Sequence, residues 1–319
     1  MNYTLPIREV NNDTLWICDM ISQDRLTDII HKKKYILLDS FREFDNSNLY
    51  YAYFWLGNEI KQFVNLEYTD TITTDHAVNF IINKKQINRY LTIKLVELYN
   101  LRVGYSWSGI GETFDLGPFL DDIHRLPIDR ESASSLLSPI KLKKNWIDIP
   151  GKEILNNLSS IADYNGNLWS WLNGLDKIIS RSAVSLITES IQEQKFAAFT
   201  EKTVYSVLGL TFPIWIGGYK QAEEWSRIGF DIFSDIINHD YQHYDTLVER
   251  CWHAIYDNLK LLQDYQQLTK LREQQLPRLK KNRDLILANT VSNYNIQLMS
   301  CWPPDLEQSV NRSIIKKLM

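Results

Sequence analysis

Polar residues that follow one apolar run and precede the next are the strongest candidates for chemistry in this sequence. The run 185–190 is apolar until it reaches Thr188 and Glu189, a pattern typical of a buried strand with polar groups at its carboxyl end. A helix is expected to begin within residues 200–203, and a second apolar run, 212–218, closes on two glycines. Because ligands of α/β proteins bind outside the carboxyl ends of parallel strands, we expect a binding site here.

The residue types in this stretch suit a nucleotide diphosphate. The N-terminus of a helix favours phosphate, and Lys202 would add a positive charge there. Glu201 can accept hydrogen bonds from the two hydroxyls of a ribose, and Gly217 and Gly218 would let the backbone approach a ligand closely. An equally good interpretation is structural, with Thr200 as an N-cap and Glu201 and Lys202 as ordinary first-turn charges.

Alternating strand and helix patterns must position these residues. Residues 77–82 read as a strand, 88–99 as a helix with one apolar face, and 102–105 as the start of another strand. Further strands are expected at 35–39 and 50–56. This alternation predicts an α/β fold with a parallel sheet.

Residues 106–150 combine glycines and prolines with little periodicity, so we interpret them as loops and a linker. A chain of 319 residues exceeds the usual size of one core. The predicted domains are therefore 1–150 and 151–319. The second half is expected to contain a strand at 230–233 and helices at the following ranges: 153–163, 168–180, 222–228, 243–262, 266–287 and a last segment from 305.

The composition excludes several classes of protein. The net charge of −4 gives no general attraction for nucleic acid or anionic membranes. No apolar run is long enough to span a bilayer, and the first residues lack the apolar core of a signal peptide. Three widely spaced cysteines fit reduced thiols. We therefore expect a cytoplasmic protein.

The order of motifs resembles the donor-binding domain of fucosyltransferase-like glycosyltransferases. That family carries a Phe-Glu-Asn-Ser strand and then a Thr-Glu-Lys helix start. Here Glu189 ends the strand, and Thr200-Glu201-Lys202-Thr203, Phe212-Pro213 and Gly217-Gly218 follow in the same order. Residues 227–241 resemble a pattern found in uncharacterised, often viral, relatives.

The resemblance implies two Rossmann-like domains that face each other across a cleft (GT-B-like), with C-terminal helices after the second. The partners it implies are a nucleotide-diphosphate sugar as donor substrate and an unknown acceptor, which could be a glycan, a protein or a modified nucleic acid. Ser190 stands where the family has asparagine, which leaves the donor base open. The residues implied to bind the donor are Arg181, Glu189, Thr200, Glu201, Lys202, Thr203, Gly217 and Gly218.

The implied reaction is displacement at the anomeric carbon, with Lys202 stabilising the leaving diphosphate as a catalytic group. No Asp-X-Asp motif occurs, so we expect neither a metal-bound diphosphate nor a cofactor. A carboxylate base is expected from the first domain. Glu43 is the favoured candidate, ahead of Asp39 and Glu112.

Two functional alternatives stay open, a non-catalytic relative and another α/β nucleotide-binding enzyme. A non-catalytic relative that binds or assembles without turnover would also fit, because no residue stands out as the base. His239 and His243 have the i, i+4 spacing of metal ligands, but no third ligand accompanies them, so a turn is the better interpretation.

Overall fold

The computed structural model of the chain describes residues 7–11, 14–17, 35–38, 49–51, 60, 63–82, 86–107, 114–143, 171–189 and 199–288. Within these residues the protein is α/β, as predicted. Its main sheet has four parallel strands in the order β6-β5-β7-β8. The strands are β5 (His76–Ile82), β6 (Val103–Trp107), β7 (Ser182–Ile187) and β8 (Phe212–Trp215).

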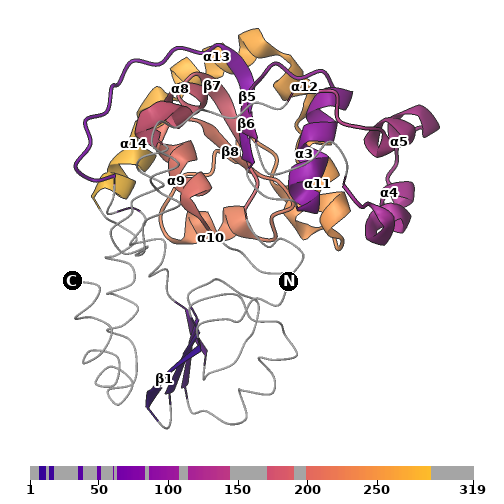
Figure 1. Cartoon of the computed structure of the whole chain (residues 1–319). Helices are drawn as coiled ribbons and strands as arrows, with labels where there is room; N and C mark the ends of the chain where they lie inside the picture. Colours follow the sequence, from indigo (N-terminus) through magenta and orange to yellow (C-terminus); the bar gives the residue numbers. More distant parts are fainter. Residues whose placement is uncertain are drawn as a thin grey trace.

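Helices cover both faces of this sheet, which explains why every residue of β7 is buried. Helices α3 (Ile87–Leu98) and α11 (Leu247–Tyr256) lie on one side, and α9 (Glu201–Leu208) and α14 (Leu276–Leu287) on the other (Figure 1). Alternate residues of a strand point to opposite faces of the sheet and therefore belong to two different hydrophobic cores. Leu186 joins the core under α3 and α11, whereas Ile187 joins the core under α9.

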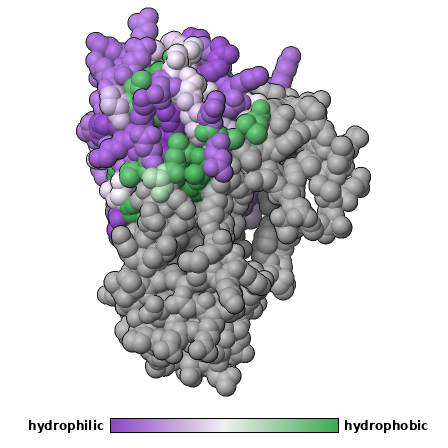
Figure 2. Space-filling model, turned by 90° about the vertical axis from the view of Figure 1, so that its left-hand side faces the viewer, coloured by the Kyte–Doolittle hydropathy of each residue, from purple (hydrophilic) through white to green (hydrophobic). Residues whose placement is uncertain are grey.

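The remaining described helices lie along the rest of the chain. They are η1 (Gly117–Phe119), α4 (Leu120–Arg125), α5 (Arg130–Leu137), η3 (Trp171–Leu175), α8 (Asp176–Ile179), α10 (Gln221–Arg227), η4 (Asp240–His243), α12 (Leu259–Gln263) and α13 (Tyr265–Gln274). On the side where α14 lies, hydrophilic residues cover the upper surface, and a group of hydrophobic residues lies below them (Figure 2). Of the described helices, none is both long and apolar enough to cross a membrane.

A second sheet of four strands lies near the start of the chain. Its order is β1-β2-β3-β4, formed by β1 (Ile7–Asn11), β2 (Thr14–Ile17), β3 (Tyr35–Leu38) and β4 (Leu49–Tyr51). β1 runs antiparallel to β2, whereas β2, β3 and β4 are parallel to one another. The strand predicted at 35–39 is confirmed as β3. The strand predicted at 50–56 overlaps β4 at residues 50 and 51, and residues 52–56 lie outside the described residues.

A buried arginine on α13 closes the amino edge of the main sheet. The Arg272 side chain is fully buried, and desolvation lowers its pKa to about 10. Its guanidinium donates five hydrogen bonds of 2.6–3.2 Å to segments that precede three of the strands. The acceptors are the Thr73 carbonyl, the Thr74 hydroxyl and the carbonyls of Ser180, Gly209 and Leu210.

The strand–helix–strand unit of 77–105 and the helices expected at 88–99 and 222–228 are confirmed. The main sheet, however, takes β5 and β6 from the predicted first domain and β7 and β8 from the second. β5 pairs directly with β7, so residues 76–107 form one layer with the predicted donor half. This corrects the assignment of that unit to a separate first domain.

Three local predictions are also corrected. Residues 106–150 contain α4 and α5, two short helices in a segment predicted to be loops. Residues 230–233 form no strand; the backbone N–H and carbonyl of Asp231 bond instead to the Asn282 side chain. The helix predicted at 266–287 is broken at Gln275, because Pro277 starts a new helix in its first turn. Residues 153–163 and the segment from 305 lie outside the described residues.

Candidate functional site

The main sheet has a topological switch point between β5 and β7. From β5 the chain continues to β6 on one side, and from β7 it continues to β8 on the other. Connections that leave neighbouring strands in opposite directions open a crevice at their carboxyl ends, where α/β proteins bind ligands. Two helices, α3 and α9, begin at this edge, each following one of the two central strands.

Polar side chains at the start of α3 bridge the switch point. Asn88 Nδ2 donates to the Glu189 carbonyl at 3.0 Å, and an Arg89 guanidinium nitrogen lies 3.5 Å from the Thr188 carbonyl. The Thr188 hydroxyl in turn lies 3.3 Å from the Ile81 carbonyl at the end of β5. Arg89 is fully buried, so a positive charge lies within the protein close to this edge of the sheet.

The Glu189 carboxylate organises the start of α9. It is fully buried and accepts hydrogen bonds from the Thr200 backbone N–H (2.9 Å), the Thr200 hydroxyl and the Thr203 hydroxyl (2.6 Å). Burial raises the pKa of this carboxyl above its usual value, although the charge of Lys202 opposes the rise. Thr203 also accepts a 3.0 Å hydrogen bond from the Trp215 indole, which ties the end of β8 to the same group.

Lys202 and Glu201 form an ion pair beside this cap. The Lys202 ammonium lies 2.5 Å from the Glu201 carboxylate, with side chains 8% and 19% exposed. Burial alone would raise the pKa of Glu201, but the charge and hydrogen bond of Lys202 lower it below its usual value. A phosphate at this helix end would therefore compete with Glu201 for the ammonium.

Gly217 and Gly218 are packed against the protein itself. Gly217 has φ +76°, and a Cβ there would come within 2.5 Å of Leu247 and 3.0 Å of the Cys251 sulfur. A Cβ at Gly218 would meet the Gln221 side chain at 2.0 Å. Both positions therefore require glycine for internal packing and, at Gly217, for backbone conformation.

Arg181 lies away from the other predicted donor-binding residues. It precedes β7 and forms an ion pair with Asp75, whereas Glu189 follows the same strand. β7 separates the two by about 20 Å, since a strand rises about 3.3 Å per residue. Arg181 is thus not brought to the carboxyl edge. The candidate bases Glu43, Asp39 and Glu112 lie outside the described residues.

The two histidines with metal-ligand spacing do not converge. A His239 ring nitrogen lies 2.9 Å from the Ile232 carbonyl, and His243 pairs with Glu223 at 3.0 Å. In the described part of the chain, no group of three or more His, Cys, Asp or Glu side chains could hold a metal ion. The interpretation of this segment as a turn holds, since residues 240–243 form the short 3-10 helix η4 with His239 as its N-cap.

Sequence reasoning missed Asn88 and Arg89 as members of this edge. Asn88 lies inside the first turn of α3, and its side chain reaches across to Glu189, which follows β7. Nothing in the sequence around residue 88 shows that the strand before it pairs with a strand more than one hundred residues later.

No family model, no curated protein and no solved structure matches this chain. What the protein does must therefore be inferred from its own residues and geometry.

Proposed function

We propose that this protein binds a nucleotide-diphosphate sugar at the carboxyl edge of its main sheet and transfers the sugar to an acceptor. The observation that carries this proposal is the switch point between β5 and β7, where α3 and α9 both begin. Helix starts favour phosphate, and Arg89 and Lys202 add positive charge at the same edge. The motif resemblance to fucosyltransferase-like enzymes supports the same ligand class.

In this proposal the reaction is displacement at the anomeric carbon by an acceptor hydroxyl. The bond from that carbon to the diphosphate oxygen breaks, and the diphosphate leaves with the electron pair. Lys202 stabilises the leaving group, and Glu201 accepts hydrogen bonds from the ribose, as the resemblance implies. Glu189 contributes indirectly, because it fixes Thr200 and Thr203 at the start of α9. The acceptor half, a GT-B-like partner domain with Glu43 as base, would come from the first part of the chain.

A thermal-shift screen tests ligand binding. The protein would be incubated with nucleoside diphosphates and their sugar conjugates, and at one hundred times Kd a ligand adds about 2.7 kcal/mol of stability. Lys202→Met is expected to abolish that gain. Lys280→Met is the matched control, since Lys280 is also ion-paired, at 2.6 Å to Asp70, but lies on α14. No shift with any nucleotide, or equal loss in both variants, would refute the proposal.

A non-catalytic binding role is the second candidate. The observation that favours it is the close Lys202–Glu201 pair, which leaves the ammonium shared between a carboxylate and any bound phosphate. Release of nucleoside diphosphate from the bound sugar conjugate separates the two functions. Turnover that falls roughly 10²- to 10³-fold in Lys202→Met would support transfer, since that is the usual cost of losing one pre-placed charge. Binding without any release would support the second candidate.

A further inference from the structure

A pocket of about 500 Å³ lies between α10 and the segment that leads into η4. That volume is within the range of small-molecule sites. The pocket shares no residue with the switch-point edge described above. Apolar side chains of Ala222, Ile232, Ile236 and Ile237 form part of its lining, together with Ser234, Asn238 and Gln242.

The charged groups around this pocket are mainly carboxylates. Glu223, Asp235 and Asp240 line it, and the first two have side chains 52% and 59% exposed. The histidine among the lining residues that faces Glu223 is His243, at 3.0 Å. The pocket therefore presents an excess of negative charge to anything that enters.

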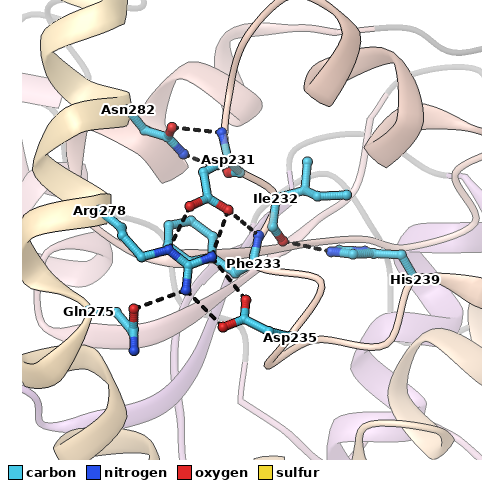
Figure 3. A network of polar contacts seen from close by, with 8 residues as sticks. All are labelled: Asp231, Ile232, Phe233, Asp235, His239, Gln275, Arg278 and Asn282. Carbon is cyan, nitrogen blue, oxygen red and sulfur yellow. Dashed lines mark hydrogen bonds and ion pairs between the residues drawn. The ribbon is translucent and has the colours of Figure 1, made fainter.

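The arginine that binds Asp235 does not cancel this excess. Arg278 binds two carboxylates at once, Asp231 at 2.6 and 3.0 Å and Asp235 at 2.9 Å to each oxygen (Figure 3). These hydrogen bonds lower the pKa of Asp235 below its usual value, so this carboxylate is ionised at neutral pH. One guanidinium against two carboxylates leaves one negative charge.

The same contacts fix one wall of the pocket. Arg278 also lies 4.8 Å above the Phe233 ring, and Phe233 has φ +58°, a backbone conformation that costs a non-glycine residue energy. Asn282 holds the backbone of Asp231 from α14 (Figure 3). Because a neighbouring helix already holds this wall in place, a ligand does not have to order it on binding.

A buried hydrogen-bond acceptor accompanies the carboxylates. His239, which also lines the pocket, has Nε2 at 2.9 Å from the Ile232 carbonyl. A carbonyl only accepts, so Nε2 carries the hydrogen. Burial lowers the pKa of His239 to about 4, which keeps the ring neutral and leaves Nδ1 as a lone pair. Nδ1 is buried and has no hydrogen-bond partner.

We propose that this pocket is a binding site for a small organic cation, an aliphatic amine whose ammonium group meets Glu223 and Asp240. The carboxylates and the His239 lone pair all accept hydrogen bonds, and an ammonium group only donates them. The isoleucine side chains suit an aliphatic chain. Phosphates and other anions are disfavoured by the same charges, which separates this site from the nucleotide site.

Calorimetry with three ligands of matched length tests whether the pocket prefers a positively charged ligand. The probes are 1,4-diaminobutane, butane-1,4-diol and succinate, at pH 7.5 and about 0.15 M ionic strength, where distant surface charges are screened. The diamine is expected to bind, with the diol and succinate at least tenfold weaker. A diol that binds as tightly as the diamine, tighter binding of succinate, or no binding of the diamine would overturn the proposal.

Two variants place the diamine in the pocket. Glu223→Gln and Asp240→Asn are each expected to weaken diamine binding about two- to fivefold, the size expected for an exposed charge contact. Glu273→Gln, at an exposed position on α13, is the matched control and should leave binding unchanged. Equal weakening by all three variants would show non-specific attraction to the acidic protein and would refute the site. Neither result depends on the nucleotide assay.

Discussion

Among single residues, Glu189 combines the strongest burial with the closest hydrogen bonding at the predicted site. A buried carboxylate is tolerated only when donors satisfy it, and here Thr200 and Thr203 supply them. Glu189, which the sequence pattern predicted to be a ligand contact, therefore holds the start of α9 in place. Any ligand meets a helix end that Glu189 has already fixed.

We expect Glu189→Ala to lower the free energy of unfolding by about 2–4 kcal/mol, because one buried donor on Thr203 and two partly buried donors on Thr200 lose their acceptor. Glu189→Gln keeps one carbonyl acceptor and should cost less. The pH dependence provides a second signature. Since the folded-state pKa is raised, the contribution of Glu189 is largest at low pH and is lost as pH rises from about 4.5 through the folded value. Urea denaturation at several pH values measures both effects.

Glu189→Gln cannot titrate, so its stability profile should lack this decline with rising pH. A Gln variant with the same pH profile as the wild type would show that Glu189 is not the titrating group. An Ala variant with unchanged stability would show that the hydrogen bonds to Thr200 and Thr203 contribute nothing.

At the scale of elements, two helices offer a direct comparison of N-terminal caps. Thr200 caps α9, and its hydroxyl also donates to the buried Glu189. Thr246 caps α11 in a capping box with Glu249, which is not fully buried. The two helices thus begin with the same residue type in different surroundings.

Thr246→Ala is expected to cost about 1 kcal/mol, the usual value for a lost cap. Thr200→Ala should cost more, about 2–3 kcal/mol, because it also removes a donor from a buried carboxylate. Chemical denaturation followed by circular dichroism gives both values. Equal losses would mean that the contact with Glu189 adds nothing to the cap itself.

Elements with a clear apolar period were predictable. The helix at 88–99 and the strands at 77–82 and near 185 follow from such patterns, and so does the helix that begins at 201. The helices α4 and α5 are short, and each buries a single residue, so they leave almost no periodic signal. The apolar run 230–233 was wrongly predicted to be a strand, because it is buried without pairing to another strand.

The site was predictable only in part, for a different reason. Local sequence patterns correctly predicted that Thr200 caps a helix and that polar residues follow β7. Strand order is a long-range property, so the sequence could not show that α3 and α9 begin at the same edge of the sheet, nor that Arg181 and Glu189 lie at opposite ends of β7. Gly217 looked like a position open to a ligand because the side chains of Leu247 and Cys251 come from a distant helix.

For the whole molecule, Arg272 links regions that are far apart in sequence. Its side chain joins α13 to the segments before β5, β7 and β8. Because all its acceptors are neutral, the interaction is a set of hydrogen bonds to a charged donor and not an ion pair. Loss of this residue would leave several carbonyls without their donor at once.

We expect Arg272→Met to lower the free energy of unfolding by at least about 3 kcal/mol, since it leaves two buried and three partly buried acceptors without their donor. Arg272→Lys should recover part of the loss by keeping the charge and up to three donors. Arg278→Met, which removes a more exposed arginine, is the control and should cost clearly less. Thermal and urea unfolding measure all three, and an Arg272→Met protein as stable as Arg278→Met would contradict this role.

The position of Arg272 also bears on how the chain folds as it leaves the ribosome. All four strands of the main sheet are synthesised before α13. At about 5–20 residues per second, the stretch from Trp215 to Arg272 takes roughly 3 to 11 s to make. During that interval the nascent sheet has its strands but lacks the side chain that binds their starts together. The protein is therefore expected to expose this edge to chaperones until α13 has been synthesised, and to reach its final stability only after that.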